Sequence, residues 1–548
     1  MNQDLIKHAR VLIIDDQALA QTFLKKSLEK IGFDSIQIAE SAKHALRLTD
    51  DILFDLIICS FNLSRDRDGY HLFEELKDKG AIKLNTTFIF TSAETDAALV
   101  NSVIELQPDD FLAKPFTSKE LSERLLRVLK RKQKLNHIYQ ALDNQDFKGA
   151  LAHIDDTLNN PKQTHLYPLV MRLKGDILLA QKDFATAARY FYDIITVQKF
   201  TWAMIGLAKA YLGLNKEEAG KAILDKLVKK PETRLAALDL LAQYYINHDE
   251  YDLAYQQFRN AKAISPRNIK RHQSVVNLAR LLHDHSGQFE AAKTMLRFAK
   301  HSVHDTEDLY LTVARAGIDY ALTLTEQESV NIAKQTDKYL ATVKREFLHT
   351  AESKNKIAIV QARLHYIRDE QDKAKQLINS LELDKYGAIS FEDYIDRAKA
   401  FHELGYQNEA VELLEEVPQV FDADDINGKI MAKFLTQETQ EKRDIPFSPR
   451  QLNNIAVQLY NQKQIDAAMQ AFKDALKLMP KNARIALNLL QVLVEQKQRQ
   501  HLDEPQQALY WKAIEVINQN KLDTQQQTRY ESLTARSEQY DVRHTNSA

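Results

Sequence analysis

The chain has 548 residues, and its 74 Lys and Arg residues nearly balance its 76 Asp and Glu residues to give a formal net charge of -2. This balance argues against non-specific binding to nucleic acid or to a membrane surface, and a lone cysteine excludes an intramolecular disulfide framework. No apolar run approaches the roughly 18 residues that span a bilayer, so we expect a cytoplasmic protein. With only 13 Gly and 11 Pro, most of the chain should be helical.

Short apolar runs alternate with amphipathic helices over residues 1–131. The expected pairs of strand and helix are 11–14 with 18–31, 36–39 with 41–48, 55–59 with 70–77, 87–90 with 96–106, and 111–113 with 118–131. Five such alternations predict an α/β domain with a five-stranded parallel sheet and helices on both faces.

Polar side chains stand directly after these apolar runs. They are Asp15, Asp16, Ser60, Thr91 and Lys114. Because the polar site of an open parallel sheet lies beyond the carboxyl ends of its strands, we expect these residues to gather at one edge.

Three motifs in this order, LIIDDQ, FIFTSAE and FLAKPF, resemble the receiver domain of bacterial two-component response regulators. The resemblance covers residues 10–131 and implies a flavodoxin-like, CheY-like fold. It implies that Asp15 and Asp16 help to hold Mg²⁺, that Thr91 contacts a phosphoryl group, and that Lys114 neutralises it. Phe111, three positions before the lysine, would be the aromatic residue that reports phosphorylation.

The departure from the family pattern falls at the phosphoryl acceptor, where an aspartate is replaced by Ser60. A carboxylate attacks a phosphoryl donor without a base and binds a hard cation, whereas a serine hydroxyl needs an activating base. Asp55 stands about 16 Å away at the other end of the strand, and Asp66 and Asp68 differ in spacing. We therefore expect no phosphorylation by the aspartyl route and only weak Mg²⁺ binding by the acidic pair.

A 34-residue period appears in two stretches that begin at Leu235 and Pro449 and resembles the tetratricopeptide repeat (TPR). Small residues would stand where two helices cross, a bulky one would fill the gap between units, and proline would end the second helix. The positions that carry the signature are Ala242, Tyr245, Ala254, Phe258, Ala261 and Pro266, then Ala456, Leu459, Ala468, Phe472, Ala475 and Pro480.

The rest of the chain is expected to be an all-α helical-repeat solenoid. Weaker copies predict TPR-like repeats over residues 132–304, degenerate helical repeats over 305–420, and carboxyl-terminal TPR-like repeats over 449–548. Residues 421–448 break the rhythm and are predicted to form an extended or mobile connector. A first unit that uses Ile138, Phe147 and Ala150 would attach the array to the last receiver helix.

The leading hypothesis is a two-component signalling adaptor that binds a histidine kinase, a phosphotransfer protein or another response regulator through the receiver or the groove of the array. One alternative is a response regulator that is phosphorylated at a non-standard acceptor and uses the array as its switched output. Another is a TPR assembly scaffold for a surface machine.

Enzymatic activity, nucleic-acid binding and membrane insertion are not expected, nor is any cofactor besides weakly bound Mg²⁺. The sequence carries no glycine-rich phosphate loop, no His-Glu-x-x-His and no nucleophile elbow. A basic stripe on the helix after residue 118, formed by Arg124, Arg127, Arg131 and Lys134, is interpreted as a solvated outer face.

Overall fold

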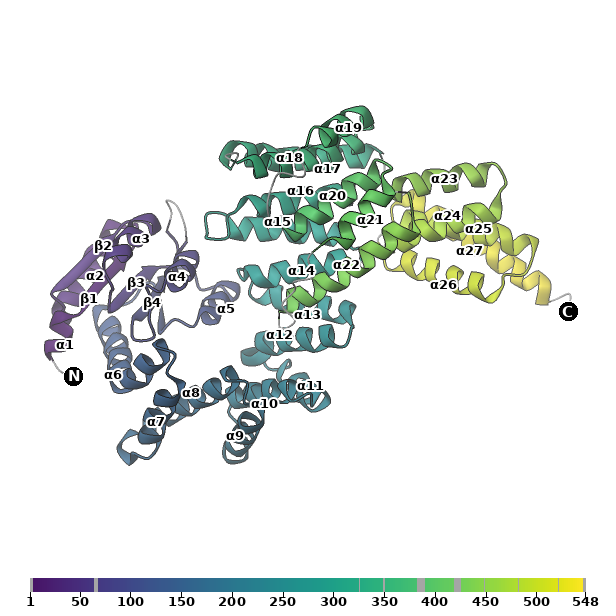
Figure 1. Ribbon diagram of the computed structural model, residues 1–548. Coiled ribbons are helices and arrows are strands. Elements are labelled where there is room, and N and C mark those ends of the chain that lie inside the picture. Colours follow the sequence, from purple (N-terminus) through teal and green to yellow (C-terminus); the bar gives the residue numbers. More distant parts are fainter. Residues whose placement is uncertain are drawn as a thin grey trace. The chain divides into compact units, whose positions relative to one another are not determined.

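The computed structural model describes residues 3–63, 68–324, 326–347, 350–381, 390–417, 425–447, 449–480, 482–520 and 522–545. Two compact units make up the chain (Figure 1). The first comprises Met1–Arg271 and Arg297–Asp305, and the second comprises His272–Leu296 and Thr306–Ala548. None of the described helices is both long and apolar enough to cross a membrane.

The first unit begins with a five-stranded parallel sheet in the order β2-β1-β3-β4-β5, which confirms the expected α/β fold. The strands are β1 (Arg10–Ile14), β2 (Ser35–Ala39), β3 (Leu56–Ser60), β4 (Thr87–Ser92) and β5 (Asp110–Ala113). All residues of β3 and β4 are buried because helices cover both faces of the sheet.

Alternate residues of each strand point to opposite faces and build two apolar cores. The helices of this region are α1 (Gln3–His8), α2 (Ala18–Ile31), α3 (Ala42–Asp51), α4 (Gly69–Asp78), α5 (Ala97–Leu106) and α6 (Ser118–Asp143). On one face Leu12 and Ile57 pack with α3, α4 and α5. On the other, Val11 and Ile58 pack with α1, α2 and α6.

Helix α6 belongs to two cores at once. It was predicted to end at residue 131, but it continues without interruption to Asp143. Its first half supplies Leu121 and Leu125 to the sheet. Its second half supplies Leu135 and Ile138 to a separate core shared with the next helix, α7 (Phe147–Leu158). The last helix of the α/β region is therefore also the first helix of the array.

The remaining helices of the first unit pack against their neighbours in sequence. They are η1 (Pro161–Leu166), α8 (Tyr167–Ala180), α9 (Phe184–Val197), α10 (Thr201–Gly213), α11 (Glu217–Leu227), α12 (Pro231–Asn247) and α13 (Tyr251–Ile264). Between α12 and α13, Ala242, Ala254 and Ala261 are fully buried and Phe258 is nearly so, while Tyr245 is partly buried. Pro266 follows the end of α13.

The second unit is helical throughout its described residues. Its helices are α14 (Ile269–Leu281), which starts at the end of the first unit, α15 (His285–Ala299), α16 (Glu307–Ala321), α17 (Glu326–Glu346), α18 (Ala351–Ile367), α19 (Gln371–Asn379), α20 (Phe391–Glu403), α21 (Gln407–Glu415), α22 (Ile426–Asp444), α23 (Pro449–Asn461), α24 (Ile465–Leu478), α25 (Ala483–Arg499), α26 (Glu504–Asn518) and α27 (Thr524–Thr545).

The pair α23 and α24 packs through small side chains in the same way as α12 and α13. Ala456, Ala468 and Ala475 are fully buried and Phe472 is 2% exposed. Leu459 is partly buried against the same core, and Pro480 follows the end of α24. The alanines let the two helix backbones approach closely.

The prediction of an extended connector over residues 421–448 is wrong for most of this stretch, because Ile426–Asp444 forms helix α22. The carboxylate of Asp425 caps the helix by accepting a hydrogen bond from the backbone N–H of Gly428. Ile430 and Phe434 are buried on one face. Stacked apolar side chains and a defined N-cap are what a stable helix needs.

Candidate functional site

The structure brings the predicted polar residues to one edge of the sheet. Ser60 and Thr91 are paired in register at the ends of β3 and β4. Asp15 follows the last residue of β1, and the backbone N–H of Lys114 donates to the carbonyl of Ser92 over 2.7 Å. These side chains come from four neighbouring strand ends, as expected for the polar edge of a parallel sheet.

Asp15 and Lys114 form the ion pair at the centre of this edge. The ammonium of Lys114 lies 2.8 Å from Oδ2 of Asp15, whose side chain is completely buried. The other carboxylate oxygen, Oδ1, accepts a hydrogen bond of 3.0 Å from the backbone N–H of Gln17. Both carboxylate oxygens are thus engaged within the chain.

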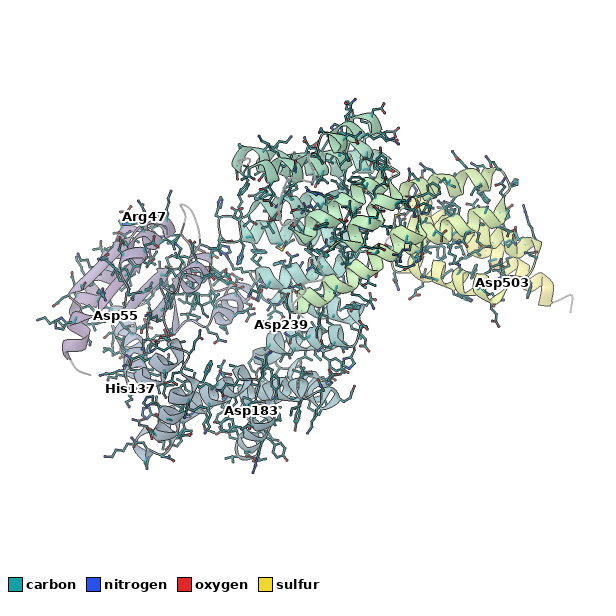
Figure 2. All side chains as sticks on the ribbon, viewed as in Figure 1. Arg47, Asp55, His137, Asp183, Asp239 and Asp503 are labelled. Atoms are coloured by element: carbon teal, nitrogen blue, oxygen red, sulfur yellow. The ribbon has the colours of Figure 1, made fainter. Side chains whose placement is uncertain are left out.

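The hydroxyl of Ser60 is engaged in a hydrogen bond within the chain. It donates to the carbonyl oxygen of Asn62 over 3.1 Å, and the residue is 6% exposed. Asp55 stands at the opposite end of β3, where its carboxylate accepts from the backbone N–H of Arg10 over 2.8 Å (Figure 2). Asp66 lies outside the described residues.

Thr91 presents an unused hydroxyl at this edge. Its side chain is fully buried, and its Oγ1 has no hydrogen-bond partner among the residues that the structure describes. An unsatisfied buried hydroxyl costs free energy, and a bound group with oxygen atoms could satisfy it.

The donor set does not suit a tight Mg²⁺ site. Mg²⁺ favours several oxygen ligands, chiefly carboxylates and waters. Here the carboxylate of Asp15 is neutralised by Lys114, and Ser60 offers only a neutral hydroxyl. Asp16 is partly exposed. Within the described residues, no group of three or more His, Cys, Asp or Glu side chains could hold a metal ion.

The first residue of α4 packs directly against the end of β3. The N–H of Gly69 donates to the carbonyl of Phe61, and a Cβ at position 69 would lie 2.5 Å from the carbonyl oxygen of Ser60. The same Cβ would lie 3.1 Å from Sγ of Cys59. Burial raises the pKa of the Cys59 thiol, and the nearby charges of Asp15 and Asp68 raise it further, so the thiol stays protonated.

Phe111 is half-buried against the core under α3, α4 and α5. The guanidinium of Arg124 donates to the carbonyl of Phe111 over 3.1 Å and to the carboxylate of Asp110 over 2.8 Å. The hydrogen bond that Arg124 donates to Asp110 raises the pKa of Arg124. Arg124 was assigned to a solvated stripe, whereas the structure uses it to tie α6 to β5.

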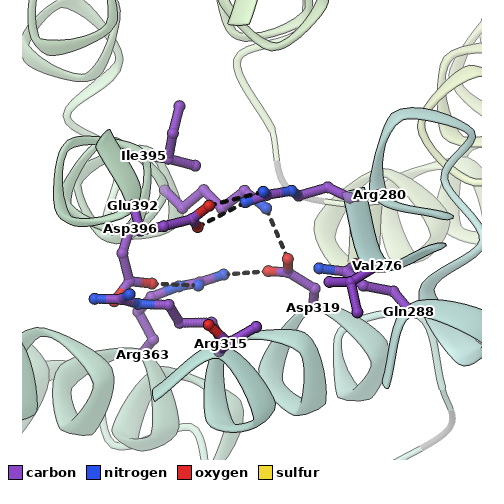
Figure 3. A pocket seen from close by; sticks show the side chains of 11 residues that line it. Val276, Arg280, Gln288, Arg315, Asp319, Arg363, Glu392, Ile395 and Asp396 are labelled. Atoms are coloured by element: carbon purple, nitrogen blue, oxygen red, sulfur yellow. Dashed lines mark hydrogen bonds and ion pairs between the residues drawn. The ribbon is translucent and has the colours of Figure 1, made fainter. Parts of the chain in front are cut away.

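A cluster of buried charges lies in the second unit and was missed by the sequence reasoning (Figure 3). Arg363 of α18 is 1% exposed and pairs with Asp319 of α16 at 2.8 Å. It also pairs with Asp396 at 2.7 Å and with Glu403 at 2.6 Å, both on α20. Burial would raise the pKa of Asp319, but the charges of Lys399 and Arg363 outweigh burial and hold the pKa well below its usual range.

Two further arginines complete the cluster. Arg280 of α14 pairs with Glu392 at 2.8 Å, and Arg315 of α16 pairs with Asp393 at 2.6 Å. The cavity that these side chains line measures only about 10 Å³, so the charges fill the space between the helices. The sequence did hold a signal, because Ala279–Arg280, Ala314–Arg315 and Ala362–Arg363 repeat an Ala-Arg pair in three helices.

Comparisons with known proteins match the α/β region. The family model for the response regulator receiver domain matches residues 11–126. A probable chemotaxis protein CheY of Rhizobium etli is 30% identical over 119 residues, which cover 22% of this chain and 91% of that protein. The probable transcriptional regulator ycf27 of Guillardia theta is 31% identical over 131 residues, which cover 24% of this chain and 49% of that protein.

Among solved structures, the chemotaxis response regulator CheY4 of Vibrio cholerae is 24% identical and covers 22% of this chain and 98% of its own, with a TM-score of 0.21. Through residues 11–126, the chain belongs to the response regulator receiver domain family. A receiver domain implies a place in two-component signalling. The match spans about half the length of ycf27 regulators, at 49% and 50% in two of them.

Proposed function

We propose that the chain is a non-catalytic adaptor or regulator of two-component signalling that acts by binding other proteins. The observation that carries this proposal is Ser60 at the end of β3, with its hydroxyl donating to Asn62 beside the Asp15–Lys114 ion pair. At this position a neutral hydroxyl has neither the charge nor the base that attack on a phosphoryl donor requires. The receiver domain would then offer a surface for recognition and would not be phosphorylated at the usual position.

The helical part is proposed to be a TPR scaffold that serves as the output. Support comes from the buried alanines at the expected 34-residue positions in the pairs α12–α13 and α23–α24. Proposed partners are a histidine kinase, a phosphotransfer protein or another response regulator. Nucleic acid is not a proposed partner, because Arg124 and Arg131 of the basic stripe already face Asp110 and Asp109.

Intact-mass spectrometry of the full chain after incubation with acetyl phosphate and Mg²⁺ tests the proposal. We expect no acid-labile phosphoryl group on the wild-type chain. The matched variant Ser60→Asp restores a carboxylate beside Thr91 and Lys114 and should gain one such group. A stoichiometric acid-labile phosphoryl group on the wild-type chain would rule the proposal out.

A second candidate is phosphorylation at a non-standard acceptor, with the array as the switched output. It is favoured by the free Oγ1 of Thr91 and the ammonium of Lys114, both of which can bind phosphoryl oxygens. The acceptor would be Ser60 or Asp66. Phosphopeptide mapping separates the two, because phosphoserine survives acid and an aspartyl phosphate does not. If neither peptide is modified by a partner kinase, this candidate fails.

A further inference from the structure

The face formed by α4 and α5 is contacted by a distant part of the same unit. The contacting stretch, Ser265–Arg271, comprises the loop between α13 and α14 and the first turn of α14; we name it the docking segment. Three of its side chains converge on the carboxylate of Glu105 in α5. Ser265 donates over 2.6 Å, Asn268 over 2.5 Å and Arg271 over 2.7 Å.

Arg271 binds the docking segment to two helices, α5 through Glu105 and α12 through Asp239. Its side chain is 3% exposed and also donates to both carboxylate oxygens of Asp239 in α12, at 2.9 and 2.7 Å. Its third nitrogen donates to the carbonyl of Ser265 over 3.1 Å. Burial would lower the pKa of Arg271, but the hydrogen bonds and charges of Asp239 and Glu105 outweigh it and raise the pKa. A planar guanidinium used on two sides in this way has one defined orientation.

Arg267 carries the contact to the polar edge of the sheet. Its guanidinium pairs with the carboxylate of Asp68, 199 residues away in sequence. It lies over the ring of Phe61, 4.9 Å from the centroid, and 5.9 Å from the centroid of Tyr70. An ion pair with a cation–π contact on a buried ring is stronger than an exposed salt bridge.

Asp68 is also the N-cap residue of α4. Its carboxylate caps the helix by accepting from the backbone N–H of His71 over 3.0 Å. The next residue, Gly69, packs against the carbonyl of Ser60 and against Sγ of Cys59. Through Asp68, the guanidinium of Arg267 is therefore linked to the start of α4, which lies against Ser60 at the end of β3.

We propose that the α4–α5 face is a binding site for the docking segment, an arginine-bearing segment of the same chain, and that Arg267 holds the start of α4 closed over Ser60 and Cys59. This site goes beyond the adaptor function and stands whether or not the receiver accepts a phosphoryl group. By linkage, a partner that opens the polar edge would weaken the hold on the docking segment, and release of the segment would loosen the edge by the same free energy.

Cys59 provides the measurement because it is the only cysteine of the chain and is buried beneath this junction. The rate of its alkylation by N-ethylmaleimide, followed by intact mass on the full chain, reports how often the junction opens. For Arg267→Ala we expect alkylation about tenfold faster than in the wild type, since a charge-assisted contact is lost. The matched control is Arg259→Ala, which removes an arginine that lies over Tyr255 on α13; its alkylation rate should stay at the wild-type value.

A second variant separates the ion pair from the helix cap. Asp68→Asn retains a side chain that can cap α4 but loses the charge that faces Arg267. Because the charge of Asp68 also raises the pKa of Cys59, each alkylation rate is first divided by the thiolate fraction obtained from its pH dependence. On this corrected scale Asp68→Asn should speed alkylation as much as Arg267→Ala, and the double variant should be no faster than either single variant. The proposal would be overturned if both single variants were alkylated at the wild-type rate. It would also be overturned if Arg259→Ala raised the alkylation rate equally, or if the effects of the two substitutions were additive in the double variant.

Discussion

Lys114 and Asp15 are 99 residues apart in sequence, yet the ammonium of one lies 2.8 Å from the fully buried carboxylate of the other. The ion pair links the ends of β1 and β5 across the polar edge of the receiver domain. If Lys114 were removed, the carboxylate of Asp15 would stay buried without a cation, which is costly. This cost determines how much the ion pair matters for the stability of the fold.

Replacing Lys114 by Ala should therefore destabilise the receiver sheet by about 2–4 kcal/mol. Hydrogen exchange of peptides from β1 and β3 measures the change. The control is Lys119→Ala, because Lys119 is 85% exposed and lies 3.9 Å from Glu123; it should cost less than about 0.5 kcal/mol. Equal effects of the two substitutions would show that the Asp15 pair is not a stabilising contact.

Arg363→Met should destabilise the second unit by about 3–5 kcal/mol, because three buried carboxylates lose the same cation. Urea unfolding followed by hydrogen exchange in α16, α18 and α20 measures this loss. Arg368→Met is the control on the same chain, since Arg368 is 35% exposed in its pair with Asp337; its effect should stay below about 1 kcal/mol. A gain in stability with Arg363→Met would contradict our account of the cluster.

The second unit should lose stability as the pH falls from about 6.5 to 4. Burial, followed by the charge of Lys442, lowers the pKa of His402 to about 4, and burial and His283 lower that of His285 to about 4. Between the lowered pKa and the ordinary value of about 6.5 the unfolded chain binds more protons, so stability rises with pH across this window and is level above it.

His402→Gln tests this pH dependence. The imidazole Nε2 of His402 lies 2.8 Å from the carbonyl of Ile445, and a glutamine amide can donate to the same oxygen without titrating. The slope of unfolding free energy against pH between 4 and 6.5 should become shallower, by up to about 3 kcal/mol over the window. An unchanged slope would mean that His402 is not one of the groups that titrate.

Gly206→Ala should destabilise the packing of α9 and α10, although alanine normally favours a helix over glycine by about 1 kcal/mol. A Cβ at position 206 would lie 2.3 Å from the ring of Phe191. We expect a net loss of about 1–3 kcal/mol in thermal unfolding. In a Phe191→Leu background, which shortens the side chain, the same substitution should cost less; an undiminished cost would place the clash elsewhere.

The elements that the sequence predicted well are those whose signal is local. Apolar runs followed by polar residues located the ends of β1, β3, β4 and β5 to within two residues, and with them Asp15, Ser60, Thr91 and Lys114. The 34-residue period located the alanines between α12 and α13, and Pro266 marked the loop that became the docking segment. In each case neighbours in sequence carry the constraint.

Features that depend on distant partners were missed. Helix α22 was predicted to be a connector because residues 421–448 break the rhythm of the repeats. Its Glu438 and Glu441 are buried, and Glu441 lies 2.8 Å from His283, 158 residues earlier. Arg363 likewise finds its carboxylates 33–44 residues away. Such pairings leave no periodic trace, so only the repeated Ala-Arg pairs could have indicated them.

Because α6 is one continuous helix, the number of residues in it fixes the rotation of its second half relative to its first half. Each α-helical residue adds about 100° of rotation and 1.5 Å of rise. One residue inserted between Val128 and Leu135 would rotate Leu135 and Ile138, together with the α7 that packs on them, by about 100° relative to Leu121 and Leu125 in the sheet core. Seven inserted residues, nearly two full turns, would restore the angle but displace the array by about 10 Å along the helix axis. The spacing along this one helix therefore sets the angle between the sheet and α7.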